Sequence, residues 1–112
     1  MATAMYSGLA ERYDRGTLFF EMGRYIEAAS ELEPIVEAAP EHLAARLLLA
    51  RAYFHSAQLG RAEVALRELI ARAPADAYAH LMLGRTLQRQ NRHAEAAGPL
   101  RIAAVMDPTL AG

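Results

Sequence analysis

A proline recurs at a fixed interval of 34 residues along this chain, at Pro40, Pro74 and Pro108. When the chain is divided at that interval, other positions also agree in size between the units, as expected of an internal repeat. One position is always small, a second is always alanine, a third is always leucine and a fourth is aromatic or leucine. The units are 9–42, 43–76 and 77–110, and the four positions are Gly16/Ala50/Gly84, Ala28/Ala62/Ala96, Leu32/Leu66/Leu100 and Phe19/Tyr53/Leu87.

These repeated positions predict that each unit is a hairpin of two α-helices. A glycine inside a helix costs about 1 kcal/mol relative to alanine, so Gly16 and Gly84 indicate that a second helix packs closely against the first. The prolines stand where the second helix of each unit has to end. Asp76 suits the N-cap of the third unit's first helix. Gly23 and Asn91 mark the turn between the two helices, because both tolerate the left-handed conformation of a helix C-terminus.

The pattern resembles the tetratricopeptide repeat, whose 34-residue signature is W-x2-L-G-x2-Y, then A-x3-F, then P. The signature positions of the second unit hold Arg46, Leu49, Ala50, Tyr53, Ala62, Leu66 and Pro74, and those of the third hold His80, Leu83, Gly84, Leu87, Ala96, Leu100 and Pro108. The tryptophan position departs from the signature, since Arg12, Arg46 and His80 occupy it. The packing at that position therefore has to differ.

The resemblance implies an all-α fold, a right-handed superhelical solenoid of three antiparallel helical hairpins with six helices. It covers residues 9–110 as one domain, and residues 1–8 are expected to be an N-terminal tail. Since little of the chain follows Pro108, we expect no C-terminal capping helix. The function implied is that of a protein–protein interaction module.

In tetratricopeptide domains the first helices of the hairpins line a concave groove that commonly binds a peptide. The resemblance places aromatic, aliphatic and arginine side chains in that groove, a composition typical of protein-binding hot spots. Arginine pairs well with carboxylates, so the expected partner is a peptide with apolar and acidic groups. The expected groove residues are Tyr13, Thr17, Phe20 and Glu21 from unit one, Leu47, Arg51, Phe54 and His55 from unit two, and Tyr78, Leu81, Arg85, Gln88 and Arg89 from unit three.

Two alternatives bear on this groove. The arginines could instead form a solvated face that pairs with nearby acids of the same chain. One ligand class is rejected, because tetratricopeptide domains that grip the C-terminal carboxylate of chaperones use a set of Lys, Asn and Arg side chains. The matching positions here hold Tyr13, Thr17, Leu48, Tyr78 and Met82, and the chain has no lysine.

The charge of the chain is unevenly distributed, although its net value is −1. Unit one carries −5, whereas units two and three each carry +2. An acidic leading end and a basic trailing end could align molecules head to tail, and ordinary scatter is an equal alternative. Solenoids usually need a polar terminal cap, so an uncapped last helix is expected to expose Leu100, Ala103 and Ala104. The resulting hypothesis is a homo-oligomer that associates through this end.

No catalytic constellation and no cofactor or metal site is found in the sequence. The four histidines, His42, His55, His80 and His93, have no metal-ligand spacing, and there is no glycine-rich phosphate loop. The chain lacks cysteine, which fits a reducing, cytoplasmic setting, and no apolar run approaches the length of a membrane span. The rival function is RNA binding by a helical repeat, against which the net charge, the acidic first unit and the missing lysine argue.

Overall fold

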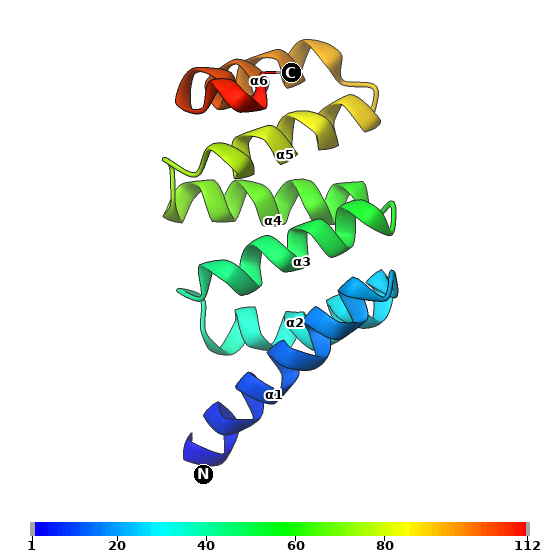
Figure 1. Ribbon diagram of the computed structural model, residues 1–112, viewed down its shortest axis with the longest axis vertical. Helices are drawn as coiled ribbons and strands as arrows, with labels where there is room; N and C mark the ends of the chain where they lie inside the picture. The colour runs from blue at the N-terminus through cyan, green and yellow to red at the C-terminus, as the bar shows by residue number, and fades with distance from the viewer. Residues whose placement is uncertain (1, 112) are drawn as a thin grey trace.

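The chain forms six α-helices and a short 3₁₀ helix in a computed structural model that describes residues 2–111, with side chains from residue 8 onward. The helices stack in chain order along the long axis of a molecule that measures 47 × 25 × 22 Å (Figure 1). This arrangement confirms the all-α helical-repeat solenoid. The elements are α1 (Ala2–Glu21), α2 (Tyr25–Ala38), α3 (Leu43–His55), α4 (Leu59–Arg72), α5 (Ala77–Arg89), α6 (His93–Met106) and η1 (Pro108–Leu110).

The stack is curved, and its curvature distinguishes two faces. Each helix packs against the next one in the chain, and α3 also contacts both α1 and α5. Pairs among α2, α4 and α6 make at most marginal contact. The first helices of the hairpins therefore approach one another on the concave side, whereas the second helices spread apart on the convex side.

The small residues at one repeated position allow the two helices of a hairpin to approach closely. A Cβ atom added to Gly84 would lie 2.5 Å from Cγ of Leu100, and one added to Gly16 would lie 3.0 Å from Cγ of Leu32. Ala50 fills the same position in the second unit and is fully buried. The close contact that the sequence predicted from the two glycines is thus confirmed.

The helix ends follow the signals in the sequence. The second helix of each unit ends two residues before the repeated proline, at Ala38, Arg72 and Met106. The side chain of Asp76 caps α5 by accepting a hydrogen bond of 3.0 Å from the backbone N–H of Ala79. Gly23 and Asn91 adopt φ values of 75° and 61°, so the predicted left-handed turns are confirmed.

The helix α1 begins at Ala2, before the start of the first 34-residue unit, so residues 2–8 are helical. The division of the chain into a tail over residues 1–8 and a domain over residues 9–110 stays a prediction. At the other end only the three-residue η1 follows α6, so no capping α-helix is present among the described residues.

The tryptophan position of the signature is filled by polar side chains that bind the preceding unit. Arg46 is 6% exposed, and its Nε donates a hydrogen bond to the carbonyl of Pro40. His80 is 8% exposed, and its Nε2 lies 2.8 Å from the carbonyl oxygen of Pro74, which can only accept. Both side chains therefore connect a first helix to the loop before it through the repeated proline.

Candidate protein-binding surfaces

The helices α1, α3 and α5 form the concave side, called the groove below, and supply a row of aromatic and arginine side chains. The guanidinium carbon of Arg51 on α3 lies 4.7 Å from the ring centre of Phe20 on α1 and 5.9 Å from that of Tyr78 on α5. These distances are within the range of cation–π attraction. Arg51 therefore bridges three units, as its place in the first helix of the middle hairpin allows.

A second guanidinium is fixed one unit further along the groove. Arg89 of α5 donates a hydrogen bond of 2.7 Å from Nη1 to the backbone carbonyl of Phe54, and its guanidinium carbon lies 4.6 Å from the Phe54 ring centre. The carbonyl belongs to the last turn of α3, where the negative end of the helix dipole favours a cation, and it also accepts a hydrogen bond of 3.2 Å from the N–H of Ala57. Arg89 thus has a defined position although its side chain is exposed.

His55 lies among these groups, and their positive charge affects the pKa of its imidazole. Its ring is stacked on Tyr25, with ring centres 4.8 Å apart, and touches Phe20 edge-on at 5.7 Å. Burial lowers the pKa of His55, and the charges of Arg51 and Arg89 lower it further. The imidazole is therefore biased toward its neutral form by two guanidinium groups that face the groove.

The groove arginines are not neutralised by acids of the same chain. Within the part of the chain that the structure describes, no carboxylate lies within 4.0 Å of a guanidinium nitrogen of Arg51, Arg85 or Arg89. Arg51 Nε is buried and has no hydrogen-bond acceptor among the described residues. The alternative in which these arginines pair with neighbouring acids thus has no support in the geometry.

The structure does not bring all the expected groove residues into one cluster. Phe20, Arg51, Phe54, His55, Tyr78 and Arg89 lie together through the contacts above. Tyr13 instead packs on the ring of His42, with centres 5.2 Å apart, and Leu81 is only 7% exposed, so it offers little surface to a ligand. Thr17 and Leu47 are partly buried, whereas Arg85, Gln88 and Glu21 are exposed.

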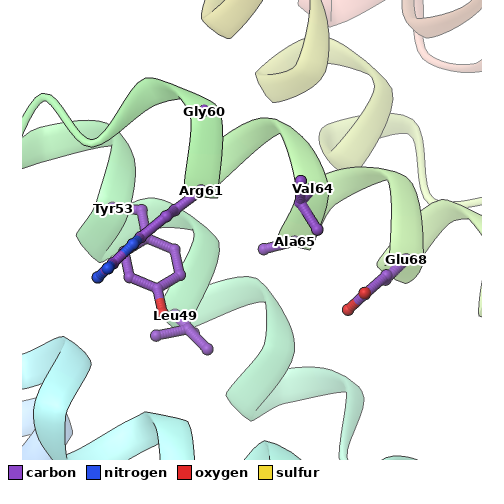
Figure 2. A pocket seen from close by; sticks show the side chains of 7 residues that line it. All are labelled: Leu49, Tyr53, Gly60, Arg61, Val64, Ala65 and Glu68. Atoms are coloured by element: carbon purple, nitrogen blue, oxygen red, sulfur yellow. The ribbon is translucent and has the colours of Figure 1, made fainter.

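A second surface is a hollow on the convex side, and its residues were not among the predicted site residues. It has a volume of about 540 Å³ and lies over α3 and α4 (Figure 2). An α-helix turns about 100° per residue, so Leu49 and Tyr53 lie on the opposite side of α3 from Arg51. The residues that line this convex hollow are Leu49, Tyr53, Gly60, Arg61, Val64, Ala65 and Glu68.

The convex hollow has an apolar floor and a charged edge. Tyr53 donates a hydrogen bond of 2.6 Å from its hydroxyl to Glu33 of α2, which fixes the ring on the floor. Burial raises the pKa of Tyr53, and the hydrogen bond to Glu33 raises it further. Val64 is 58% exposed, and Figure 2 shows it on α4 between Arg61 and Glu68. The hollow thus presents apolar surface to solvent beside acidic and basic groups.

The face of α6 that was expected to be exposed is mostly covered. Ala103 is fully buried, and Leu100 is partly buried against Gly84, because both side chains point toward α5 within the last hairpin. The expectation that Leu100, Ala103 and Ala104 form the exposed patch is therefore wrong for Ala103 and weakened for the two others, which are partly buried. The large apolar side chains of α6 that are exposed are Ile102, Val105 and Met106, called the α6 stripe below.

The four histidines have contacts within the fold. His42 caps α3 by accepting a hydrogen bond of 3.1 Å from the N–H of Ala45, and His93 Nε2 lies 3.0 Å from Oδ1 of Asn91. His55 and His80 make the contacts described above. Across residues described with side chains, no group of three or more His, Cys, Asp or Glu residues is arranged to hold a metal ion.

None of the described helices combines the length and apolar character needed to cross a membrane.

Comparisons with known proteins agree with the repeat. Two family models described as tetratricopeptide repeat match residues 19–83 and 56–111. A comparison with curated proteins gives no match. The fold is similar to that of MamA from Desulfovibrio magneticus RS-1, which is 26% identical over 88% of this chain and 55% of that chain, with a TM-score of 0.81. The present chain thus spans little more than half of that MamA chain.

Two tetratricopeptide structures from other proteins are also similar. The Arabidopsis OM64 domain is 17% identical over 91% of this chain and 84% of that chain, with a TM-score of 0.84. The first such domain of Spaghetti (RPAP3), bound to the HSP90 peptide SRMEEVD, is 20% identical over 89% and 79% of the two chains, with a TM-score of 0.83. At these identities the likeness concerns the fold.

Proposed function

Because the chain belongs to the tetratricopeptide repeat family, we propose that it is a protein–protein interaction module whose concave groove binds a peptide with acidic and apolar groups. The observation that supports this proposal is that Arg51, Arg89 and Arg85, which is at the repeated position of Arg51, have no carboxylate partner among the described residues. Guanidinium groups that are held in place lose little freedom on binding a carboxylate. The aromatic rings of Phe20 and Phe54 offer apolar surface beside them.

The charge along the groove changes from one end to the other, so an acidic peptide is expected to bind in one orientation. Glu21, His55 and Arg89 occupy one repeated position, so the charge along this line changes from negative in unit one to positive in unit three. An acidic group of the peptide is expected near Arg85 and Arg89, with apolar side chains toward Phe20. The C-terminus of a chaperone is not the expected ligand, because the residues that grip it in related domains are missing.

The test is charge reversal in the third unit. We expect Arg85→Glu with Arg89→Glu to weaken binding at least about tenfold, because the groove then repels the acidic peptide. The matched control is Arg61→Glu with Arg72→Glu, which changes the net charge equally on exposed positions of α4, outside the groove. Fluorescence anisotropy with labelled peptides that alternate Glu with Leu or Phe measures the affinity, and their Gln versions test the need for charge. Equal affinity of the two double variants would rule out the groove.

The same assay distinguishes peptide binding from the rival function, which is RNA binding. An RNA-binding repeat would bind single-stranded RNA with an affinity that falls steeply as salt rises. We expect the acidic peptide to bind and RNA to fail to bind at physiological salt. Binding of RNA that depends on Arg51 and Arg89 would favour the rival.

Self-association is the second candidate function, and the α6 stripe favours it. Val105 is 78% exposed, Met106 45% and Ile102 42%. Neighbouring exposed apolar residues of this size commonly mark a contact surface. Light scattering over a range of concentrations is expected to show a concentration-dependent increase in mass, and a protein that stays monomeric throughout would exclude this function.

A further inference from the structure

The α6 stripe breaks the pattern of the repeat. The positions of Ile102, Val105 and Met106 hold Pro34, Glu37 and Ala38 in the first unit and Glu68, Ala71 and Arg72 in the second. Large apolar side chains are thus absent from these positions where the hairpin folds in the same way. The fold of the third hairpin does not require them, so a contact outside the hairpin is the better reason for their presence.

A further hairpin stacked on α6 would leave most of the stripe exposed. In the first two units another hairpin does follow, yet Glu37, Glu68, Ala71 and Arg72 at the same positions remain exposed, whereas Pro34 and Ala38 are partly buried. Leu18 of α1 is a contrasting case. It is exposed, but its equivalents Ala52 and Thr86 are fully buried in units that have a hairpin before them, so a preceding hairpin would cover Leu18. The α6 stripe therefore needs a partner that approaches the solenoid from its outer face.

The stripe and the convex hollow lie on the same face. Glu68 lines the hollow from α4, and Ile102 follows it by one repeat, so Ile102 has the equivalent place on α6. The hollow offers an apolar floor at Leu49 and Tyr53, and helices commonly dock their apolar side chains into such grooves. The repeat thus places the apolar stripe on the same face of the chain as the apolar hollow, whose lining residues Figure 2 shows.

The charges beside the two surfaces are complementary. Arg101 borders the α6 stripe and is exposed, without a carboxylate within 4.0 Å in the described part of the chain. Glu33 of α2 binds Tyr53 at the hollow, and Glu68 lines the hollow beside the basic Arg61. The rival apolar pair, Leu18 and Met22 of α1, has Asp14 and Glu21 close by in the sequence, and these acids would be repelled by Glu33 and Glu68.

We propose that the convex hollow binds the α6 stripe of a second copy of this chain, with Arg101 of one copy near Glu33 of the other. This inference rests on the self-association proposed above and names its two surfaces. Because both surfaces lie on one face, the contact can form twice and close a two-fold dimer. Val105 and Met106 then cover the floor at Leu49 and Tyr53.

The experiment measures the dimer dissociation constant of the full chain by analytical ultracentrifugation. Val105→Glu alters the stripe and Val64→Glu alters the hollow, and both positions are exposed, so the variants should fold normally by circular dichroism. Each variant is expected to dimerise at least about tenfold more weakly than the wild type, because a charge enters an apolar contact. An equimolar mixture of the two retains one intact stripe and one intact hollow, and should associate about tenfold more tightly than either variant alone.

The outcomes separate this inference from self-association itself. If Val64→Glu dimerises like the wild type while Val105→Glu does not, α6 mediates association but the hollow is not its receptor. If the wild type remains monomeric, self-association and this inference both fail. Loss of the dimer in Leu18→Glu but not in Val105→Glu would also overturn the inference. Arg101→Glu and Glu33→Arg should each weaken the dimer, and their combination should restore it.

Discussion

Position 57 adopts a left-handed backbone conformation that alanine rarely takes, with φ of 60°. The same turn holds Gly23 in the first unit and Asn91 in the third, residue types that tolerate this conformation. An L-residue with a Cβ atom pays about 1–2 kcal/mol there. The middle hairpin therefore closes with a strained residue, which the packing of α3 on α4 has to offset.

The turn gives a direct prediction for stability. Ala57→Gly is expected to raise the free energy of unfolding by roughly 0.5–1 kcal/mol, because the left-handed conformation then costs little, although the unfolded chain gains entropy. Gly23→Ala is the matched change in the first unit, and it should lower stability by about 1 kcal/mol. Urea denaturation followed by circular dichroism measures both. A destabilising Ala57→Gly would contradict the argument.

His55 provides a prediction for pH. Burial, Arg51 and Arg89 lower its pKa in the folded state, so the unfolded chain binds the proton more readily. The stability associated with the neutral ring is complete above the ordinary pKa of about 6.5 and is lost as the pH falls below it. We expect Arg89→Gln to raise the pKa of His55 in an NMR titration. Arg85→Gln is the control, and an equal shift in both variants would exclude the specific effect of Arg89.

At the scale of the helices, polar residues replace the signature tryptophan as links between units. Arg46 reaches back to the carbonyl of Pro40 and pairs with Glu68 of its own hairpin at 3.2 Å. Arg12 occupies the same repeated position on α1, where it makes only a 3.8 Å ion pair with Glu31 and is 41% exposed. We therefore expect Arg46 to contribute more to the free energy of unfolding than Arg12, although both occupy the same position of the repeat.

This contrast can be measured with a matched pair of substitutions. Arg46→Ala should lower the free energy of unfolding by about 1–3 kcal/mol, because a buried guanidinium loses its hydrogen bonds and its packed stem. Arg12→Ala should change it by less than about 0.5 kcal/mol, as an exposed ion pair contributes little. Thermal or urea unfolding distinguishes the two. Equal effects would show that Arg46 does not connect the first two units.

At the scale of the whole molecule, stability depends on contacts between neighbouring helices. Such a solenoid behaves approximately as a row of units that each contact only the adjacent ones. The helices α3 and α4 have a hairpin on both sides, whereas α1 and α6 have one neighbouring helix with extensive contact. Unfolding is therefore expected to begin at the ends.

Hydrogen exchange tests this expectation. We predict the slowest amide exchange in α3 and α4 and faster exchange in α1 and α6, because local opening of an end hairpin breaks fewer contacts. Mass spectrometry of peptic fragments resolves the individual helices. Uniform protection from α1 to α6 would instead indicate that the whole chain unfolds as one unit.

Much of the fold could be predicted from the period of the sequence. Gly16 and Gly84 indicate the close contacts because they have no Cβ atom, and the three prolines indicate the helix ends because they restrict the backbone before them. The start of α1 was missed, since the repeat says nothing about the residues before it. The assignment of the groove residues stays a prediction, and the structure brings part of the set together around Arg51 and Arg89. The apolar residues of the α6 stripe could also have been found from the sequence, because each of their three positions holds a charged residue in one of the other units.

A 34-residue period is a property of local spacing, so the arrangement as a row of three helical hairpins can be predicted from the sequence alone. Which side chains meet across the hairpins depends on the tertiary structure. Curvature brings Phe20 and Tyr78 to the two sides of Arg51, and it opens the hollow over Tyr53 on the opposite side of α3. Burial of Ala103 likewise depends on how α6 lies on α5. These outcomes follow from the angles between packed helices, which no repeat period specifies.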